Sequence, residues 1–287
     1  MKIGILAFVT AQTPDSATLA KKCEALGFES FFLPEHPILP VHCKTPYPVG
    51  DGKIPDVYSQ LGDPFVQLAF AAAATRRIKI GTGICLLPEH EPIALAKQVA
   101  TLDLYSGGRF IFGIGAGWLV DESEIMGVDF HKRWVITREY VRAMKALWTK
   151  PEASFEGKYV KFPPVFSYPK PAQKPHPPVH VGAGGVGSIE RALKNTVAVG
   201  DGWAPLGMTP DQLATALVDL KKMCAEAGRD FNKIEISMYF PVIEGDPRRA
   251  VAQYREAGCH RLVFASPSLE SGNPEAALEE LARPYIQ

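Results

Sequence analysis

Strand-like and helix-like segments alternate along the whole of this 287-residue chain, and this alternation limits the fold more than any other feature. The strand-like runs are rich in Ile, Val and Phe, as expected for a parallel sheet that helices cover. Eight such units predict an α/β fold of the (β/α)8 TIM barrel type, for which about 250 residues are typical. The predicted strands are residues 2–8, 30–36, 78–88, 109–117, 178–184, 201–207, 233–242 and 261–266.

Proline and glycine mark the predicted helix ends. Six helices are expected to begin at a polar residue followed by proline, because the polar side chain caps the helix and proline costs nothing at its first position. Four helices are expected to end at a glycine, which readily adopts a left-handed backbone. The predicted starts are Thr13, Asp63, Glu91, Thr209, Asp246 and Asn273, and the predicted ends are Gly27, Gly107, Gly228 and Gly258.

A G-x-G-x-x-G pattern occurs at Gly182, Gly184 and Gly187, between a predicted strand and a predicted helix. In a Rossmann domain this pattern occupies the first βα turn, and an acid about 20 residues later binds ribose. Here the loop follows the fifth strand, so we interpret it as a phosphate site at a helix N-terminus of a barrel. Asp201 then has no ribose to bind, since it begins the next strand. Glycines that only turn the chain are the alternative.

Two proline-rich insertions interrupt the alternation. Residues 37–62 follow the second strand, so they are expected to lie over the C-terminal face of the barrel, where barrel active sites occur, and to act as a lid. Residues 151–178 precede the fifth strand and therefore start on the opposite face. Their segment 154–162 is predicted to be a structural hairpin.

The tetrapeptide LPEH occurs twice, at residues 33–36 and 87–90, each time at the end of a predicted strand. Glu and His at strand ends suit acid–base chemistry or a metal. Adjacent strand residues point to opposite faces, so at most one of each pair is expected to face the barrel mouth. With no third clustered ligand, we predict no metal site. The remaining histidines are expected to have surface or packing roles: His42, His131, His176, His180 and His260.

Glycines also lie inside the third and fourth strands, at residues 81 and 83 and at residues 113, 115 and 117. A strand glycine often marks a bulge or the close approach of a ligand to the backbone. The two strands are neighbours in a barrel, so they suggest a flat ligand across the strand ends. Together with an anion site after the fifth strand, this pattern predicts a cofactor with a ring and a phosphate.

In these motifs and in those named below, the chain resembles the luciferase-like monooxygenase superfamily, and within it the coenzyme F420-dependent oxidoreductases. The similarity runs from Met1 to the last helix, as a single luciferase-like barrel domain over residues 1–287. Each motif is modest alone, but their order and spacing are specific. The motifs are LPEH at 33–36, IGTGI at 80–84, GRFIFGIGAGW at 108–118, GAGGVG at 182–187 and GDGW at 200–203.

The resemblance implies a flavin or deazaflavin ring in the barrel mouth, backed by a cis peptide between Gly83 and Ile84. It implies F420 as the cofactor, with FMN as the alternative, and hydride transfer to or from an organic substrate. His36 is the implied catalytic residue. Trp118 stands where some members carry Glu, so that acid is missing here. The implied cofactor-binding residues are Glu35, Gly83, Ile84, Gly115, Gly117, Gly184, Gly185, Val186 and Gly187.

Charge and cysteine content limit the partners. The 31 basic and 31 acidic residues cancel, so the chain has no basic footprint for nucleic acid or for a membrane surface. Five scattered cysteines without a C-x-x-C pattern favour a reducing cytoplasm. The apolar run at residues 3–9 imitates a signal peptide but is short and precedes a capped helix. We expect a cytoplasmic homodimer that binds a small-molecule substrate.

Two rival functions remain open from the sequence. A metal-dependent barrel hydrolase would use the Glu–His pairs, and stoichiometric zinc in the purified protein would support it. A non-catalytic cofactor-binding protein would bind the cofactor without turnover of any substrate.

Overall fold

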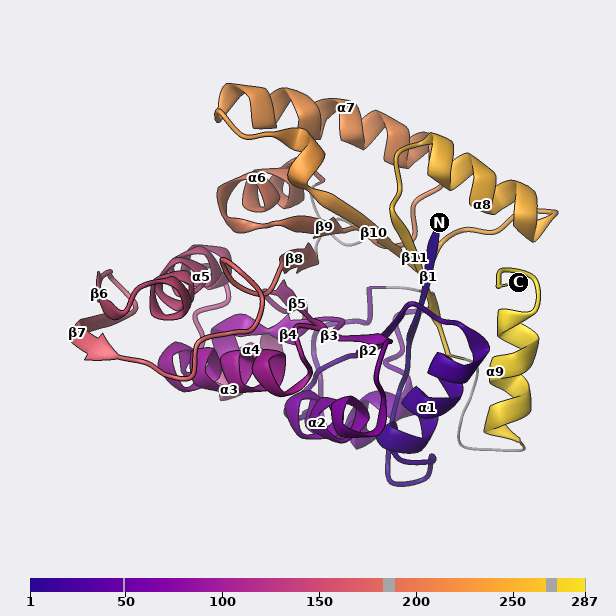
Figure 1. Cartoon of the computed structure of the whole chain (residues 1–287), viewed down its shortest axis with the longest axis horizontal. Helices are drawn as coiled ribbons and strands as arrows, with labels where there is room; N and C mark the ends of the chain where they lie inside the picture. Colours follow the sequence, from indigo (N-terminus) through magenta and orange to yellow (C-terminus); the bar gives the residue numbers. More distant parts are fainter. Residues whose placement is uncertain (49, 183–188, 267–272, 287) are drawn as a thin grey trace.

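The computed structural model describes residues 1–48, 50–182, 189–266 and 273–286. The predicted barrel is confirmed: eight parallel strands run side by side, and the pairing of β3 with β5 closes the ring (Figure 1). The strands of the ring are β1 (Lys2–Leu6), β2 (Ser30–Leu33), β3 (Lys79–Thr82), β5 (Phe110–Gly115), β8 (Val179–Gly182), β9 (Gly202–Ala204), β10 (Glu235–Tyr239) and β11 (Arg261–Ala265).

The third predicted strand is divided in two. After β3 the chain passes through Gly83 and Ile84 and then forms β4 (Cys85–Leu86), which pairs with β5 beyond the place where β3 pairs with it. The second LPEH motif therefore does not end a strand. Its first three residues form the 3-10 helix η2 (Leu87–Glu89).

Helices surround the strands (Figure 1). The helix α9 packs beside α1, where Lys22 pairs with Glu279, so the last helix joins the ring next to the first one. The helices are α1 (Ser16–Leu26), α2 (Pro64–Ala74), α3 (Pro92–Tyr105), α4 (Val120–Ile125), α5 (Arg133–Thr149), α6 (Ile189–Val199), α7 (Pro210–Glu226), α8 (Pro247–Glu256) and α9 (Pro274–Ala282), with the short 3-10 helices η1 (Asp56–Gln60) and η3 (Phe231–Lys233).

The predicted helix ends are confirmed with one exception. The side chains of Asp63, Glu91, Thr209, Asp246 and Asn273 all accept backbone N–H bonds at helix starts. The predicted start at Thr13 is wrong. The Asp15 carboxylate caps α1 by accepting the Thr18 N–H at 3.0 Å, whereas the Thr13 hydroxyl belongs to the preceding turn. The four predicted terminal glycines all have positive φ, as C-terminal helix caps require.

The barrel interior and the space under the helices form separate cores. Most buried apolar side chains lie between the sheet and the helices. A smaller cluster fills the inside of the ring, since alternate residues of each strand point inward. Its buried members are Leu6, Phe32, Ile111, Ala204, Tyr239 and Val263.

A polar cluster fills the barrel at the N-terminal ends of its strands. The fully buried Arg261 guanidinium donates to Glu29 at 2.8 and 3.0 Å and to Glu235 at 3.2 Å. His180, also buried, lies 3.3 Å from Glu235. Asp201 is at this end too and pairs with Lys145, which agrees with its predicted loss of a ribose-binding role. The charges of this cluster are therefore structural and lie opposite the barrel mouth.

Both predicted insertions are confirmed. Residues 152–166 form an antiparallel hairpin of β6 (Glu152–Glu156) and β7 (Lys161–Phe166), which projects away from the strands (Figure 1). Residues 37–62 connect β2 to the region before α2 and contain η1. Among the described residues, no helix combines the length and the apolar character that crossing a membrane would require.

Candidate active site

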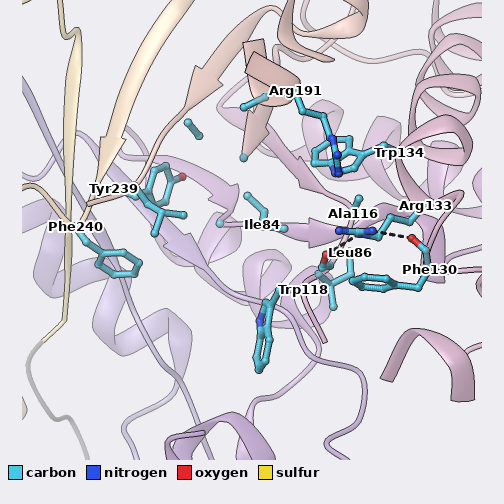
Figure 2. Close-up of a pocket in the computed structure, with 16 residues that line it drawn as sticks. Ile84, Leu86, Ala116, Trp118, Phe130, Arg133, Trp134, Arg191, Tyr239 and Phe240 are labelled. Atoms are coloured by element: carbon cyan, nitrogen blue, oxygen red, sulfur yellow. Dashed lines mark hydrogen bonds between the residues drawn. The ribbon is translucent and has the colours of Figure 1, made fainter. Parts of the chain in front are cut away.

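A pocket of about 360 Å³ opens beyond the C-terminal ends of the strands (Figure 2). This volume lies within the range of about 300–1,000 Å³ that small-molecule sites occupy. The walls come from barrel strands and from α5 and α6. The lining residues are Gly83, Ile84, Leu86, Ala116, Gly117, Trp118, Phe130, Arg133, Trp134, Gly182, Arg191, Ala192, Ala204, Leu206, Tyr239 and Phe240.

Ile84 lies at the centre of the pocket wall (Figure 2). The peptide bond between Gly83 and Ile84 is cis, as the resemblance implied. The Ile84 side chain packs against two glycines, because a Cβ on Gly115 would lie 2.1 Å from its Cδ1 and a Cβ on Gly182 2.5 Å from its Cγ2. A side chain at either position would displace the Ile84 side chain from this place. The result is an apolar ridge that a flat ligand can cover.

Aromatic rings border the ridge on two sides. Tyr239 and Phe240 lie at one end of the pocket, and Trp134 and Phe130 lie toward the other, with Trp118 below Ile84 in the view of Figure 2. Burial raises the pKa of the Tyr239 phenol. That hydroxyl therefore stays neutral near pH 7 and can only donate or accept a hydrogen bond.

His36 is held behind Trp118 by a buried carboxylate. Its Nδ1 lies 2.7 Å from Glu122 Oε2, and the two side chains are 5% and 0% exposed. The imidazole also meets the rings of Tyr58 and Trp118 edge-on, with centroids 5.1 and 5.8 Å away. Because Nδ1 faces the carboxylate, the proton belongs on Nδ1 in a neutral ring, and Nε2 remains available to accept one.

The 37–62 insertion is fastened to the same region. Asp121 accepts hydrogen bonds from the backbone N–H groups of Lys44 and Thr45 and from the Thr45 hydroxyl. These bonds, that of the Thr45 hydroxyl first, lower the pKa of Asp121 to about 2. Tyr47 extends the contact, because its ring lies edge-on to Trp118. The insertion therefore covers the His36 side of the pocket, while its predicted lid movement stays a prediction.

Glu89 is a buried carboxyl close to Glu122, the partner of His36. Burial, followed by the charge of Glu122, raises the pKa of Glu89 to about 8. Its Oε1 accepts the Ser123 hydroxyl at 3.0 Å, and its Oε2 has no hydrogen-bond partner among the described residues. Glu89 is therefore expected to be protonated at neutral pH, which avoids two buried negative charges side by side.

Glu35 points away from the pocket, in agreement with the predicted alternation. Its carboxylate accepts the Leu86 N–H at 2.6 Å and lies 3.0 Å from His90 Nε2. Cys85 joins the pair, and the potential ligand atoms of the three residues lie within 4.8 Å of one another. The prediction that no third potential ligand clusters with the Glu–His pairs is therefore wrong. The chain breaks after β3, and this break brings Cys85 to a position that strand periodicity does not predict. Burial raises the pKa of the Cys85 thiol well above its usual value, so the group forms a hydrogen-bonded network around a neutral thiol.

Two arginines form the wall of the pocket near α5 and α6. Arg133 donates from Nε to the Gly117 carbonyl at 3.2 Å and from Nη1 to the Phe130 carbonyl at 2.7 Å (Figure 2). Its guanidinium carbon lies 3.6 Å from the centre of the Phe130 ring. Burial, and then the charge of Arg191, lower the pKa of Arg133. Two arginine side chains therefore lie in this part of the lining.

Comparison with known proteins agrees with this geometry. Residues 1–285 match the family described as luciferase-like monooxygenase. The chain belongs to the luciferase-like monooxygenase family. An uncharacterized protein of Mycobacterium tuberculosis strain H37Rv is 38% identical over 287 residues, which are 98% of each chain. The oxygenase component of a flavin-dependent trigonelline monooxygenase from Acinetobacter baylyi is 32% identical over 61% of this chain and 48% of that protein.

A solved structure supports the fold of this luciferase-like chain. The coenzyme F420-dependent tetrahydromethanopterin reductase from Methanopyrus kandleri has a TM-score of 0.74 at 21% identity. The match covers 99% of this chain and 98% of that one. At this identity the likeness concerns the barrel fold.

The structure brings together part of the predicted site. Gly83, Ile84 and Gly117 line the pocket, and Gly115 lies directly behind Ile84. His36 and Glu35 are outside the lining, although His36 contacts it through Trp118. The predicted phosphate loop lies outside the described residues, since it comprises Gly184, Gly185, Val186 and Gly187.

Sequence reasoning missed several residues of this luciferase-like site. Glu122, Arg133, Tyr239 and Arg191 belong to no motif, and three of them occur on helices among other charged residues. Tyr239 could have been found, because it lies near the C-terminal end of the predicted strand 233–242, and that end of a strand faces the barrel mouth. No local signal distinguishes the other three.

Proposed function

We propose that this protein is an oxidoreductase that transfers a hydride between coenzyme F420 and an organic substrate. The carrying observation is the apolar ridge of Ile84 in the pocket, with glycine directly behind it and aromatic rings at its ends. A flat tricyclic ring fits such a surface, and three glycines of the lining leave their backbone open to it: Gly83, Gly117 and Gly182. The bound deazaflavin would supply the hydride chemistry.

The residues of this chain would bind, orient and exclude water. Ile84 would support one face of the ring, and Trp118 and Tyr239 would limit where a substrate can lie against it. His36 would hold or move a proton at Nε2, because Glu122 fixes its other nitrogen. The glycine loop at 184–187 would bind the phosphate, as the sequence motif suggests.

FMN is the second candidate cofactor. It is supported by the flavin-dependent relative from Acinetobacter baylyi, which is more similar in sequence than the F420-dependent reductase. The GAGW and DGW motifs support F420. In fluorescence titrations of the purified protein with both cofactors, we expect tighter binding of F420. Equal or tighter binding of FMN would replace the first proposal by the second.

We also propose that the protein is a homodimer that uses α2 as part of its interface. This helix is apolar except for Gln67, yet Val66 and Phe70 are 59% and 62% exposed. A helix that is apolar all round is normally buried. A second copy of the chain would cover it. A cytoplasmic location stays a prediction, which the scattered free cysteines support.

A further inference from the structure

The end of the pocket at Tyr239 and Phe240 differs from the end at α5. In Figure 2 these two aromatic side chains lie on one side of the pocket, and Trp134 and Arg133 lie on the other. Among the lining residues that the structure describes, the charged side chains are Arg133 and Arg191, and both belong to the Trp134 side. The Tyr239 end therefore offers a hydroxyl group and no charge.

The Tyr239 side chain is almost fully buried, yet its hydroxyl group makes no hydrogen bond to any residue that the structure describes. The residue is 6% exposed and lines the pocket from the last position of β10. Its backbone is fixed, because its N–H donates to the Pro205 carbonyl at 2.8 Å and its carbonyl accepts the Gly207 N–H at 2.9 Å. Its ring meets that of Phe32 edge-on, with centroids 5.5 Å apart. A buried hydroxyl without a partner costs free energy, so this one indicates a place where an oxygen of a ligand binds.

Phe240 is the one non-glycine residue with a positive φ, at 50°, in the part of the chain that the structure describes. This backbone costs free energy in a residue that carries a Cβ, and such residues cluster at ligand sites. The flanking chain holds the conformation. The Phe240 N–H donates to the Val263 carbonyl at 2.9 Å, and the Val242 N–H donates to the hydroxyl of the buried Tyr254 at 2.8 Å. Phe240 remains 36% exposed and therefore presents its ring to the pocket instead of burying it in the core.

We propose that Tyr239 and Phe240 form the substrate end of the pocket and select an uncharged, ring-containing molecule. The Tyr239 hydroxyl would bind an oxygen of this molecule, either a carbonyl or a hydroxyl, and Phe240 would cover its apolar body. The cofactor ring would lie beside this end, against Ile84. The inference rests on the proposed function in taking this pocket as the reaction site, and it adds the substrate class that the site would accept.

The chemistry of the two side chains determines this class. Burial raises the pKa of the Tyr239 phenol, so its hydroxyl is neutral near pH 7 and pairs with a neutral oxygen. A charged group at this end would leave water without an opposite charge among the described lining residues beside it, which costs far more than the burial of a neutral group. The Phe240 ring favours a ring as its partner, because aromatic groups gain from stacked and edge-on contacts.

The test uses Tyr239→Phe, which removes one oxygen, and Phe240→Leu, which removes one ring. The matched controls make the same changes at exposed positions. They are Tyr105→Phe at the end of α3, where the residue is 81% exposed, and Phe166→Leu on β7, where it is 73% exposed. Circular dichroism and thermal unfolding establish that each variant is folded. If Phe240→Leu disturbs the fold, the comparison of Tyr239→Phe with its control decides alone.

Three ligands of similar size are titrated by ligand-observed NMR, with the protein alone and with FMN or F420 added. Acetophenone carries a neutral oxygen, α-methylstyrene has a CH2 group in place of that oxygen, and benzoate carries a charge. Tyr239→Phe should weaken acetophenone binding about 3- to 10-fold, because one neutral hydrogen bond is lost, and should leave the binding of the other two ligands unchanged. Phe240→Leu should weaken the binding of both uncharged ligands by a similar factor.

The inference is overturned if Tyr239→Phe binds acetophenone as Tyr105→Phe does, or if it loses affinity for α-methylstyrene or benzoate to the same extent. It is also overturned if a folded Phe240→Leu binds both uncharged ligands as Phe166→Leu does, or if the wild-type protein binds no acetophenone with or without cofactor. A loss of FMN or F420 affinity in Tyr239→Phe, with unchanged acetophenone binding, assigns the hydroxyl to the cofactor and refutes the substrate role.

Failure of the proposed function is distinguishable. A wild type that binds neither FMN nor F420 refutes the cofactor proposal, while the acetophenone titration of the same protein without cofactor still decides whether Tyr239 and Phe240 bind an uncharged oxygen compound. A wild type that binds a cofactor but not acetophenone refutes the inference alone.

Discussion

Replacing Glu122 by Gln tests whether the buried His36–Glu122 pair organises the site. The substitution keeps the size of the side chain but removes its charge. The 2.7 Å contact between Nδ1 and Oε2 is lost or becomes a neutral hydrogen bond, since the amide can face His36 with either its oxygen or its NH2 group. If the amide NH2 group faces His36, it donates to Nδ1, so the ring proton moves from Nδ1 to Nε2. His36 can then no longer accept a proton at Nε2.

The expected magnitude follows from the burial of the pair. A hydrogen bond to a charged group contributes about 1.5–3 kcal/mol, and both side chains here are almost fully buried. At about 2–4 °C per kcal/mol for a chain of this size, we expect the melting temperature to fall by about 3–12 °C. The same free energy, lost in the reaction, corresponds to a decrease in kcat of about 10- to 100-fold.

Two measurements are required, because a purely structural role would change only one of them. Thermal unfolding is compared with kcat and KM at saturating cofactor, with a substrate found by screening. The control is Glu124→Gln, which removes the same charge from an exposed position on α4. A pH profile of kcat that shifts in Glu122→Gln but not in the control supports a positioning role. If kcat and its pH profile are unchanged while the melting temperature falls, the pair is structural and the chemistry does not depend on His36.

Three further predictions concern other parts of the molecule. Because the pKa of Glu89 is raised from 4.5 to about 8, the folded state binds more protons than the unfolded state between about pH 5 and 8. Stability should therefore fall as the pH rises across this range and level off above about pH 8, and this decrease should be absent in Glu89→Gln when melting temperatures are measured from about pH 5 to 9. Gly113→Ala should give insoluble or strongly destabilised protein, since its Cβ would lie 2.0 Å from the Thr82 carbonyl oxygen, whereas Gly127→Ala, with open space around it, should cost only about 1–2 kcal/mol in chemical unfolding. Phe70→Asp should convert a dimer to a monomer in light scattering; a wild type that is already monomeric contradicts the proposed interface.

Much of the fold could be predicted because its signals are local. The alternation of apolar runs with capped helices gives the strands and helices in order, and five of the six proline-marked helix starts are confirmed. The predicted helix start at Thr13 was wrong because Asp15 follows two residues later, and its carboxylate is a better N-terminal cap than the Thr13 hydroxyl. The strand glycines also carried structural information, since the Ile84 side chain occupies the space that a Cβ on Gly115 or Gly182 would need.

The candidate site could be predicted only in part. Gly83 and Gly117 were found because a glycine inside a strand is a signal at a single position, and Ile84 followed only from the family resemblance. Glu122 could not be found, since its partner His36 is 86 positions away and an acid on a short surface helix is unremarkable in sequence. The same holds for Cys85, which strand periodicity alone does not bring next to Glu35 and His90.

The sequence by itself therefore determined the barrel, its two insertions and the strand glycines near its mouth, because hydrophobic periodicity, helix caps and steric limits act within a few residues of the chain. Tertiary structure alone decided which charged groups meet there. Arg133 and Arg191 lie on different helices and face one pocket, and Glu122 lies against His36. Such pairs form when the ring closes between β3 and β5 and distant loops come together over one end of it. No local sequence pattern predicts which of these distant residues become neighbours.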